Sequence, residues 1–250
     1  FNKNILIKNV YFSYGDSKQN VFENFSYEIE KNKVLGIIGA SGSGKSTLVD
    51  LLMGISSPKS GKILIDGKDD FKDSTRYWQS KIGYVPQETY LLDESIKSNI
   101  AFGIPENQID IKKIEKIITS IGLREMIENL SEGINSKVGD NGVKISGGQK
   151  QRLGIAQVLL NDPKVIVLDE PNNGLDPNGI SDMNILIKKL QFEGKTICLS
   201  THNLRDVEEV CTDVVIFKEG LSSKAISMRN LILNSKTWSL IVESPEAAKK

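Results

Sequence analysis

Residues 34–46 read Val-Leu-Gly-Ile-Ile-Gly-Ala-Ser-Gly-Ser-Gly-Lys-Ser, and the predicted fold is organised around this stretch. The apolar run at 34–38 predicts a fully buried strand that ends at Gly39. Residues 46–53 place apolar side chains at helical spacing and predict a helix. The stretch therefore indicates a strand, a glycine-rich turn and a helix that follow one another directly.

The turn between strand and helix carries the pattern Gly39-xxxx-Gly44-Lys45-Ser46, which is typical of loops that cradle phosphate. Glycines let several backbone N–H groups approach a polyphosphate, and the helix N-terminus adds the positive end of its dipole. Lys45 is expected to reach the β- and γ-phosphates, and the Ser46 hydroxyl to ligate Mg²⁺. The sequence thus predicts a nucleotide site made by Gly39, Ser41, Gly42, Ser43, Gly44, Lys45, Ser46 and Thr47.

The composition is that of an ordinary folded protein. Of the 250 residues, 39% are apolar and 26% are charged, which excludes a disordered chain and suffices for one large α/β domain with subdomains. Lysine plus arginine and aspartate plus glutamate both number 32, so the zero net charge gives no support to nucleic-acid binding. No apolar run approaches the roughly 18 residues that a membrane-spanning helix needs.

Both ends of the sequence look cut. The chain starts at Phe1 in place of a methionine, and residues 244–250 resemble the start of a helix with no helix after it. We therefore expect a piece of a longer polypeptide, in which residues 221–250 form a truncated C-terminal extension.

A small antiparallel β-subdomain is predicted beside the nucleotide-binding core. Residues 4–14, 22–29 and 61–67 alternate between apolar and polar side chains and end in polar or Asp-Gly turns, as strands of a half-buried sheet do. Tyr14 has two interpretations: it is a strand residue, or it is an exposed aromatic that stacks on adenine.

A block of helices interrupts the alternation of strands and helices. A short strand at 81–85 is stopped by Pro86-Gln87, and helices are then predicted at 94–99, 111–121 and 124–130. The isoleucines of the second helix share one face and are expected to pack in the core. We interpret this block as an inserted helical subdomain.

A second glycine-rich helix start lies at 146–149, where Ser146 is predicted to cap a helix that continues to about residue 160. Gly147 and Gly148 in the first turn each cost about 1 kcal/mol relative to alanine. Such a cost is tolerated where backbone must approach a ligand closely, so this helix N-terminus is a candidate second anion site. The alternative is a poorly formed cap with no ligand.

Two acidic residues and the single histidine follow buried strands. Residues 165–168 predict a strand that delivers Asp169 and Glu170 at its carboxyl end, where ligands bind in open α/β sheets. One carboxylate there can hold the Mg²⁺ shell, and its neighbour can polarise an attacking water. Residues 196–199 predict the last strong core strand, and His202 comes shortly after it. A lone histidine is usually structural, but at this edge it could sense a γ-phosphate.

Seven features now resemble the ATP-binding-cassette (ABC) ATPases over residues 4–220. In family order they are the A-loop aromatic Tyr14, the Walker A loop at 39–46, the Q-loop glutamine Gln87, the signature motif at 146–149, the Walker B strand at 165–170, the D-loop at 173–176 and the switch histidine His202. Two departures are Ile145, where leucine usually precedes the signature, and a D-loop that reads Asn-Asn-Gly-Leu-Asp.

The resemblance implies an α/β fold with a P-loop NTPase (RecA-like) core, an antiparallel β-subdomain and an inserted α-helical subdomain. The domain would cover residues 1–220, with the β-subdomain at about 1–33 and 61–70 and the helical subdomain at about 90–151. The P-loop core would take the rest.

The family's mechanism implies a head-to-tail dimer with two ATP molecules at the interface. Each ATP would contact the P-loop of one protomer, and Ser146, Gly147, Gly148 and Gln149 of the other. Tyr14 and Asp176 are also expected to bind the nucleotide. Glu170 would be the catalytic base, assisted by His202 and Gln87. Ser46, Gln87 and Asp169 would hold Mg²⁺. Because no motif is degenerate, a homodimer is expected to have two active sites.

The resemblance also implies an energy-coupling ATPase of a membrane exporter or lipid or glycolipid flippase, at the cytoplasmic face of the cell membrane. Its partners would be a second ABC ATPase domain and a transmembrane domain, fused upstream or separate, with no nucleic acid. Residues 84–87, 95–100 and 138–142 resemble exporter-type domains.

Other parts of the sequence resemble stand-alone subunits. These parts are residues 169–177 and 200–203 and a predicted extra strand at 237–242. One alternative is therefore a stand-alone ATPase subunit of an importer or an ABC-2 type transporter. Another is a soluble ABC ATPase without a transport role.

Overall fold

The computed structural model describes residues 1–250 except 16, 18, 69–74, 219–220, 223–225 and 229–250. Two predicted features, the strand at 237–242 and the helix start at 244–250, therefore lie outside the described residues. So does most of the predicted C-terminal extension.

The predicted β-subdomain is present as an antiparallel sheet of order β2-β1-β4. Its strands are β1 (Asn4–Phe12), β2 (Phe22–Glu30) and β4 (Ser60–Ile65). Ile5 and Ile7 on β1 pair with β2 on one side and β4 on the other, and both are fully buried. The alternation seen in the sequence is therefore the alternation between a buried and a solvated face.

The core sheet has the order β10-β8-β3-β7-β6-β5, with β9 paired to β8. The strands in the middle are parallel, and every residue of β3 (Val34–Gly39) and β7 (Thr196–Thr201) is buried. Apolar strands of this kind need helices on both faces of the sheet. The other members are β5 (Ile82–Val85), β6 (Val165–Asp169), β8 (Asp213–Lys218), β9 (Leu221–Ser222) and β10 (Ile226–Ser227).

The prediction that residues 196–199 form the last strong core strand is wrong. β8 follows them, pairs with β3 along its length and buries Val214, Val215 and Phe217. Its apolar run is only four residues long and lies between Asp213 and Lys218, so it gives a weak signal in the sequence. It becomes a core strand because β3 offers it a free edge.

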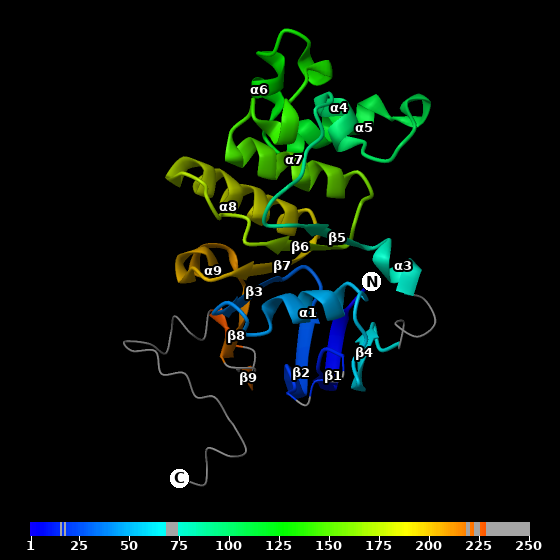
Figure 1. Ribbon diagram of the computed structural model, residues 1–250, viewed down its shortest axis with the longest axis vertical. Helices are drawn as coiled ribbons and strands as arrows, with labels where there is room; N and C mark the ends of the chain where they lie inside the picture. The colour runs from blue at the N-terminus through cyan, green and yellow to red at the C-terminus, as the bar shows by residue number, and fades with distance from the viewer. Residues whose placement is uncertain (16, 18, 69–74, 219–220, 223–225, 229–250) are drawn as a thin grey trace.

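Helix α1 (Lys45–Leu52) and the antiparallel sheet lie on one side of this sheet (Figure 1). On the other side lie α7 (Gly147–Leu159), α8 (Pro177–Phe192) and α9 (Leu204–Val210). Helix α1 lies between the core sheet and the antiparallel sheet, and shares one hydrophobic cluster with both. The other face packs against the second cluster, which extends into the helical subdomain. Val165 and Val167 of β6 belong to the first cluster, while Ile166 and Leu168 belong to the second. This is the alternation of side chains across one strand.

The helical subdomain forms the upper part of the molecule in Figure 1. Each predicted helix is present within one to two residues at most ends, and isoleucines 114, 117 and 118 of α5 are buried as expected. Its helices are α4 (Ile96–Ile100), α5 (Ile111–Ser120), α6 (Arg124–Glu128) and α7 (Gly147–Leu159), with 3₁₀ turns at Glu106–Gln108, Gly133–Asn135 and Asp140–Gly142. The remaining helices are α3 (Thr75–Gln79), α8 (Pro177–Phe192) and α9 (Leu204–Val210).

Candidate functional site

The predicted phosphate loop, both carboxylates and the histidine meet in one cavity of about 550 Å³ at the carboxyl ends of β3, β6 and β7. This is the edge at which open parallel sheets bind ligands. The cavity is lined by Tyr14, Val21, Ser41, Gly42, Gly44, Lys45, Ser46, Thr47, Gln87, Asp169, Glu170 and His202. All of these except Val21 were predicted from the sequence.

The glycines of the loop allow backbone conformations and close contacts that a side chain would prevent. Gly44 has φ +110° and Gly42 has φ +76°, a region that side chains with a Cβ rarely adopt. A Cβ on Gly39 would stand 2.3 Å from Ser43 Oγ and 2.7 Å from the carbonyl oxygen of Phe217. Only glycine fits there, because β8 runs alongside.

The loop presents donors that suit an anion. Ser43 Oγ is buried and has no hydrogen-bond partner among the described residues. Lys45 Nζ donates to the carbonyl oxygens of Gly39 (2.6 Å) and Ala40 (3.0 Å), so its charge lies over the loop. A buried hydroxyl without a partner and a cation above a glycine-rich cradle fit the oxygens of a polyphosphate.

The carboxylate of Asp169 is held from both neighbouring strands. Ser200 Oγ, on β7, donates to Asp169 Oδ1, and the Tyr84 hydroxyl, on β5, donates to Asp169 Oδ2 at 3.1 Å. Burial, followed by the charges of Asp169 and Asp50, raises the pKa of Tyr84 to about 12. The sequence pointed to Asp169 but not to Tyr84, because strand order is invisible in it.

Glu170 and His202 form the other half of the site. Glu170 lies one residue beyond β6 with φ +45°, an uncommon conformation for a residue other than glycine. Its N–H donates to the carbonyl oxygen of Ser200 at 3.0 Å, which holds this conformation. Glu170 Oε2 then lies 3.2 Å from Nδ1 of His202. Strain of this kind concentrates at functional sites.

The segment that carries His202 is fixed by a buried acid that the sequence did not reveal. Thr201 Oγ1 donates to Asp206 Oδ2 at 3.0 Å, and the Asn203 N–H donates to Thr201 Oγ1 at 3.0 Å. Asp206 is only 5% exposed and lies in the first turn of α9. The Asp206 carboxylate thereby positions the turn on which His202 projects into the cavity.

Tyr14 lies at the rim of the cavity and not within a strand, since β1 ends at Phe12. Its hydroxyl is 2.9 Å from Thr47 Oγ1, and its ring meets the edge of Phe12 at 5.0 Å between centroids. Half of the side chain is exposed. The tyrosine ring therefore lines the cavity beside the phosphate loop and is only partly covered by the protein.

Gln87 also lines the cavity, and its backbone is tied to the helical subdomain. The Gln87 carbonyl oxygen accepts a hydrogen bond from Gln151 Nε2 at 2.7 Å, and Gln151 Oε1 accepts one from Thr89 Oγ1 at 2.9 Å. Gln151 lies on α7 and is buried. Movement of α7 would therefore be passed directly to the segment around Gln87.

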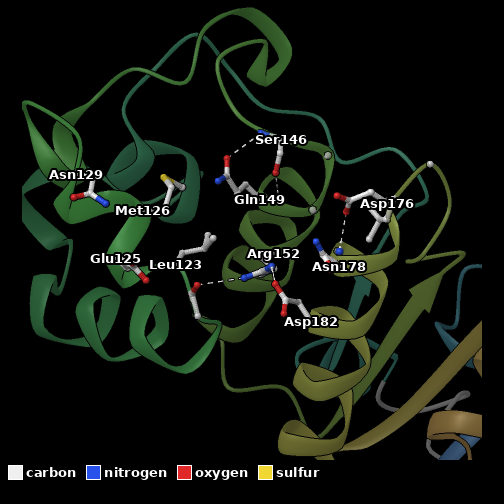
Figure 2. Close-up of a pocket in the computed structure, with 16 residues that line it drawn as sticks. Leu123, Glu125, Met126, Asn129, Ser146, Gln149, Arg152, Asp176, Asn178 and Asp182 are labelled. Carbon is white, nitrogen blue, oxygen red and sulfur yellow. Dashed lines mark hydrogen bonds and ion pairs between the residues drawn. The ribbon is translucent and has the colours of Figure 1, made fainter.

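The remaining predicted site residues lie elsewhere. Ser146, Gly147, Gly148, Gln149 and Asp176 line a second cavity of about 710 Å³ between α6, α7 and the start of α8 (Figure 2). The two cavities share no lining residue. Within one chain the glycine-rich start of α7 therefore does not meet the phosphate loop.

The side chains of this second group complete helix caps. Ser146 Oγ accepts from the Gln149 N–H at 3.2 Å and Gln149 Oε1 accepts from the Ser146 N–H at 2.9 Å, a full capping box. Asp176 Oδ1 accepts from the Gly179 N–H at 2.8 Å and caps α8. The alternative of a poorly formed cap at Ser146 is wrong.

Arg152 joins three elements at the wall of the second cavity, as Figure 2 shows. Its Nη2 donates to Asp182 Oδ2 on α8 at 2.6 Å, and its Nη1 donates to the Gly122 carbonyl oxygen beyond α5 at 3.2 Å. Its Nε is buried without a partner among the described residues. The helical subdomain is thereby tethered to α8, a contact that the sequence did not predict.

The capping box predicts a stability effect at a residue also expected to bind nucleotide. Replacement of Ser146 by alanine should lower the free energy of unfolding by about 1 kcal/mol, because the Gln149 N–H loses its acceptor. Ser146→Asn supplies another capping oxygen and should retain most of the stability. Urea unfolding followed by circular dichroism measures both. Equal stability of Ser146→Ala and the unchanged protein would contradict this role of the hydroxyl.

Within the described part of the chain, no helix is both long and apolar enough to cross a membrane.

Comparisons with known proteins show which family this chain resembles. The family model described as ABC transporter matches residues 22–173. A putative export ATP-binding/permease protein of Rickettsia prowazekii (strain Madrid E) is 39% identical over 236 residues, which are 94% of this chain and 40% of that protein. An ATP-dependent lipid A-core flippase of Cupriavidus pinatubonensis is 32% identical over 213 residues, 85% of this chain and 36% of the flippase.

A solved structure of a bacterial Atm1-family ABC exporter with ATP bound is similar to this chain with a TM-score of 0.81 and 27% identity. The match covers 93% of this chain and 40% of that one. This chain thus spans 36–40% of the length of these relatives. Its α/β fold is the ABC ATPase fold that the sequence predicted. The chain belongs to the ABC transporter family and corresponds to the ATP-binding domain of these proteins.

Proposed function

We propose that this chain hydrolyses ATP and that the reaction drives export of a substrate through a membrane domain. The observation that carries the proposal is the gathering of Lys45, Asp169, Glu170 and His202 in one cavity at the carboxyl edge of the sheet. A phosphate-binding cation, a metal-holding carboxylate and a base beside a histidine are the groups that nucleotide hydrolysis requires.

The residues fit ATP with Mg²⁺. The phosphates would lie in the loop at 39–46, where Ser43 Oγ has no protein partner among the described residues and Lys45 supplies positive charge. Tyr14, half exposed at the rim of the cavity, would stack on the adenine. Ser46, Gln87 and Asp169 would hold Mg²⁺, which supplies charge neutralisation for the transferred phosphoryl group when bound.

Glu170 is the proposed base for the attacking water. Its carboxylate is mostly buried and lines the same cavity as Lys45. His202, 3.2 Å away, would hold this carboxylate in place and contact the γ-phosphate. Gln87 would complete the site from the helical side, and its attachment to α7 would make it sensitive to movement of the helical subdomain.

The second cavity supports a dimer. This cavity shares no lining residue with the phosphate loop of its own chain. It is lined by Ser146, Gly147, Gly148, Gln149 and Asp176, and it includes the N-terminus of α7, which favours anions. In a head-to-tail homodimer each such cavity would cover the nucleotide of the other protomer. Two equivalent ATP sites follow, and loss of the γ-phosphate would release the halves.

The favoured transport function is export or lipid flipping. Relatives that align with most of this chain are named as export proteins and lipid A-core flippases. The membrane domain would be fused to this one or present as a separate subunit, and the ATPase would act at the cytoplasmic face of the membrane. A stand-alone importer subunit or a soluble ABC ATPase has no comparable support among those relatives.

Fractionation of the native cells with an antibody against this segment tests the proposal. We expect a reactive band in the membrane fraction that is well above 27.7 kDa, as for a domain fused to a membrane domain. A band near 27.7 kDa that co-purifies with a separate membrane protein would instead indicate a stand-alone subunit. A small soluble band without a membrane partner would overturn the transport function.

A further inference from the structure

Asp169 at the nucleotide site has a polar contact to Tyr84, a residue with no role among the predicted site residues. The hydroxyl of Tyr84 donates to Asp169 Oδ2 at 3.1 Å. Tyr84 belongs to neither the phosphate loop, the second cavity nor the predicted catalytic set. Yet it reaches a carboxylate that is proposed to hold the metal.

The sheet places Tyr84 for this contact. On the parallel strands β5 and β6, Tyr84 is the partner of Val167, two residues before Asp169. Residues two apart on a strand share a face, so Tyr84 and Asp169 rise from the same face of the sheet. The hydrogen bond of 3.1 Å shows that the long side chain of Tyr84 spans the diagonal between the two positions. β5, β6 and β7 lie side by side in Figure 1.

The backbone on both sides of Tyr84 is fixed against α7. Gly83 packs so closely on this helix that a Cβ would stand 2.0 Å from Cγ1 of Val158. Beyond Tyr84, the carbonyl oxygen of Gln87 is bound by Gln151 of the same helix. The Tyr84 hydroxyl is therefore presented by a rigid segment, which lowers the entropic cost of keeping its hydrogen bond.

Both oxygens of the Asp169 carboxylate consequently carry a donor from the protein. Ser200, directly opposite Asp169 on β7, binds Oδ1, and Tyr84 binds Oδ2. Two donors from opposite sides fix the orientation of the carboxylate plane. One lone pair on each oxygen then remains available to another partner. Hydrogen bonds of this kind orient metal-binding carboxylates, and their loss typically weakens metal binding by about 10–100-fold.

We propose that Tyr84 is a positioning residue that orients Asp169 for Mg²⁺ and so sets how much Mg²⁺ the ATP site needs. The inference rests on the proposed function, since it assigns Asp169 to the metal shell. Tyr84 acts through Asp169 and touches neither ATP nor the reacting atoms, so its removal should change the metal dependence and not the affinity for metal-free nucleotide.

Binding of a fluorescent ATP analogue to the purified protein, titrated with Mg²⁺ and repeated in EDTA, tests the inference. Tyr84→Phe keeps the ring and removes the hydroxyl. The Mg²⁺ concentration at half-maximal enhancement of binding should rise about tenfold, the lower end of the usual loss. Binding in EDTA should be the same as in the unchanged protein. Tyr11→Phe is the matched control, because Tyr11 is 39% exposed against 38% for Tyr84 and lies on β1.

The outcomes separate this inference from the proposed function. A Mg²⁺ requirement of Tyr84→Phe that equals that of Tyr11→Phe, or falls below it, would overturn the positioning role while the proposed function stands. Weaker binding of Tyr84→Phe in EDTA would also overturn it, because the hydroxyl would then serve the nucleotide or the fold. If the unchanged protein bound the analogue without any response to Mg²⁺, the metal site and the inference would both be wrong.

Discussion

Replacement of Glu170 by glutamine is expected to lower ATP turnover at least about 10²-fold, the usual scale for a positioned general base, while ATP binding is retained. Glutamine keeps the size of the side chain and its place beyond β6 but cannot accept a proton from water. The contact of 3.2 Å to His202 shows that the side chain is held within the cavity. Phosphate release measured at saturating ATP gives the turnover.

The matched control is Glu193→Gln at the exposed end of α8, which makes the same change of charge away from the cavity. Its turnover should equal that of the unchanged protein. Because Glu170→Gln would bind ATP without consuming it, sedimentation with Mg-ATP should also detect a longer-lived dimer. Turnover of Glu170→Gln within a few-fold of the control would remove Glu170 from the role of base.

Replacement of Lys45 by alanine is expected to act on the preceding step, the binding of ATP. Lys45 Nζ lies above the loop on the carbonyl oxygens of Gly39 and Ala40, where its charge faces any phosphate that enters. Hydrogen bonds between charged groups contribute about 1.5–3 kcal/mol, which corresponds to a loss of affinity of about 10–100-fold. Titration with a fluorescent ATP analogue measures the dissociation constant.

Lys188→Ala, on the exposed face of α8, removes an equal charge outside the cavity and should leave the dissociation constant unchanged. An affinity of Lys45→Ala equal to that of this control would show that the lysine does not contact the phosphates. The two variants of the active site thus separate binding from chemistry, because one should lose affinity and the other turnover.

Much of the site could be predicted because its parts are local in sequence. The strand, turn and helix around Gly39 follow from an apolar run, from glycines that permit positive φ and from helical spacing, and the structure confirms them as β3 and α1. Asp169, Glu170 and His202 follow buried parallel strands. Such strands end at a common edge, so their meeting could be expected from the pattern alone.

Other features depend on which elements become neighbours. The sequence gives only a weak signal for β8, since its four apolar residues acquire a partner only when β3 lies beside them. Asp206 and Arg152 are ordinary polar residues in the sequence. Their roles arise because α9 brings Asp206 under Thr201, and because α7 brings Arg152 between α8 and the end of α5.

The residue types and their spacing predict the chemistry of this protein: a phosphate loop, two carboxylates at a strand end, a histidine and a second glycine-rich helix start. The distribution of these groups depends on the tertiary fold, which places Ser146 and Asp176 in a separate cavity and the Tyr84 hydroxyl against the carboxylate of Asp169. The reason is physical. Backbone conformation and side-chain chemistry are encoded residue by residue, whereas the order of strands in a sheet follows from the burial of all of them together.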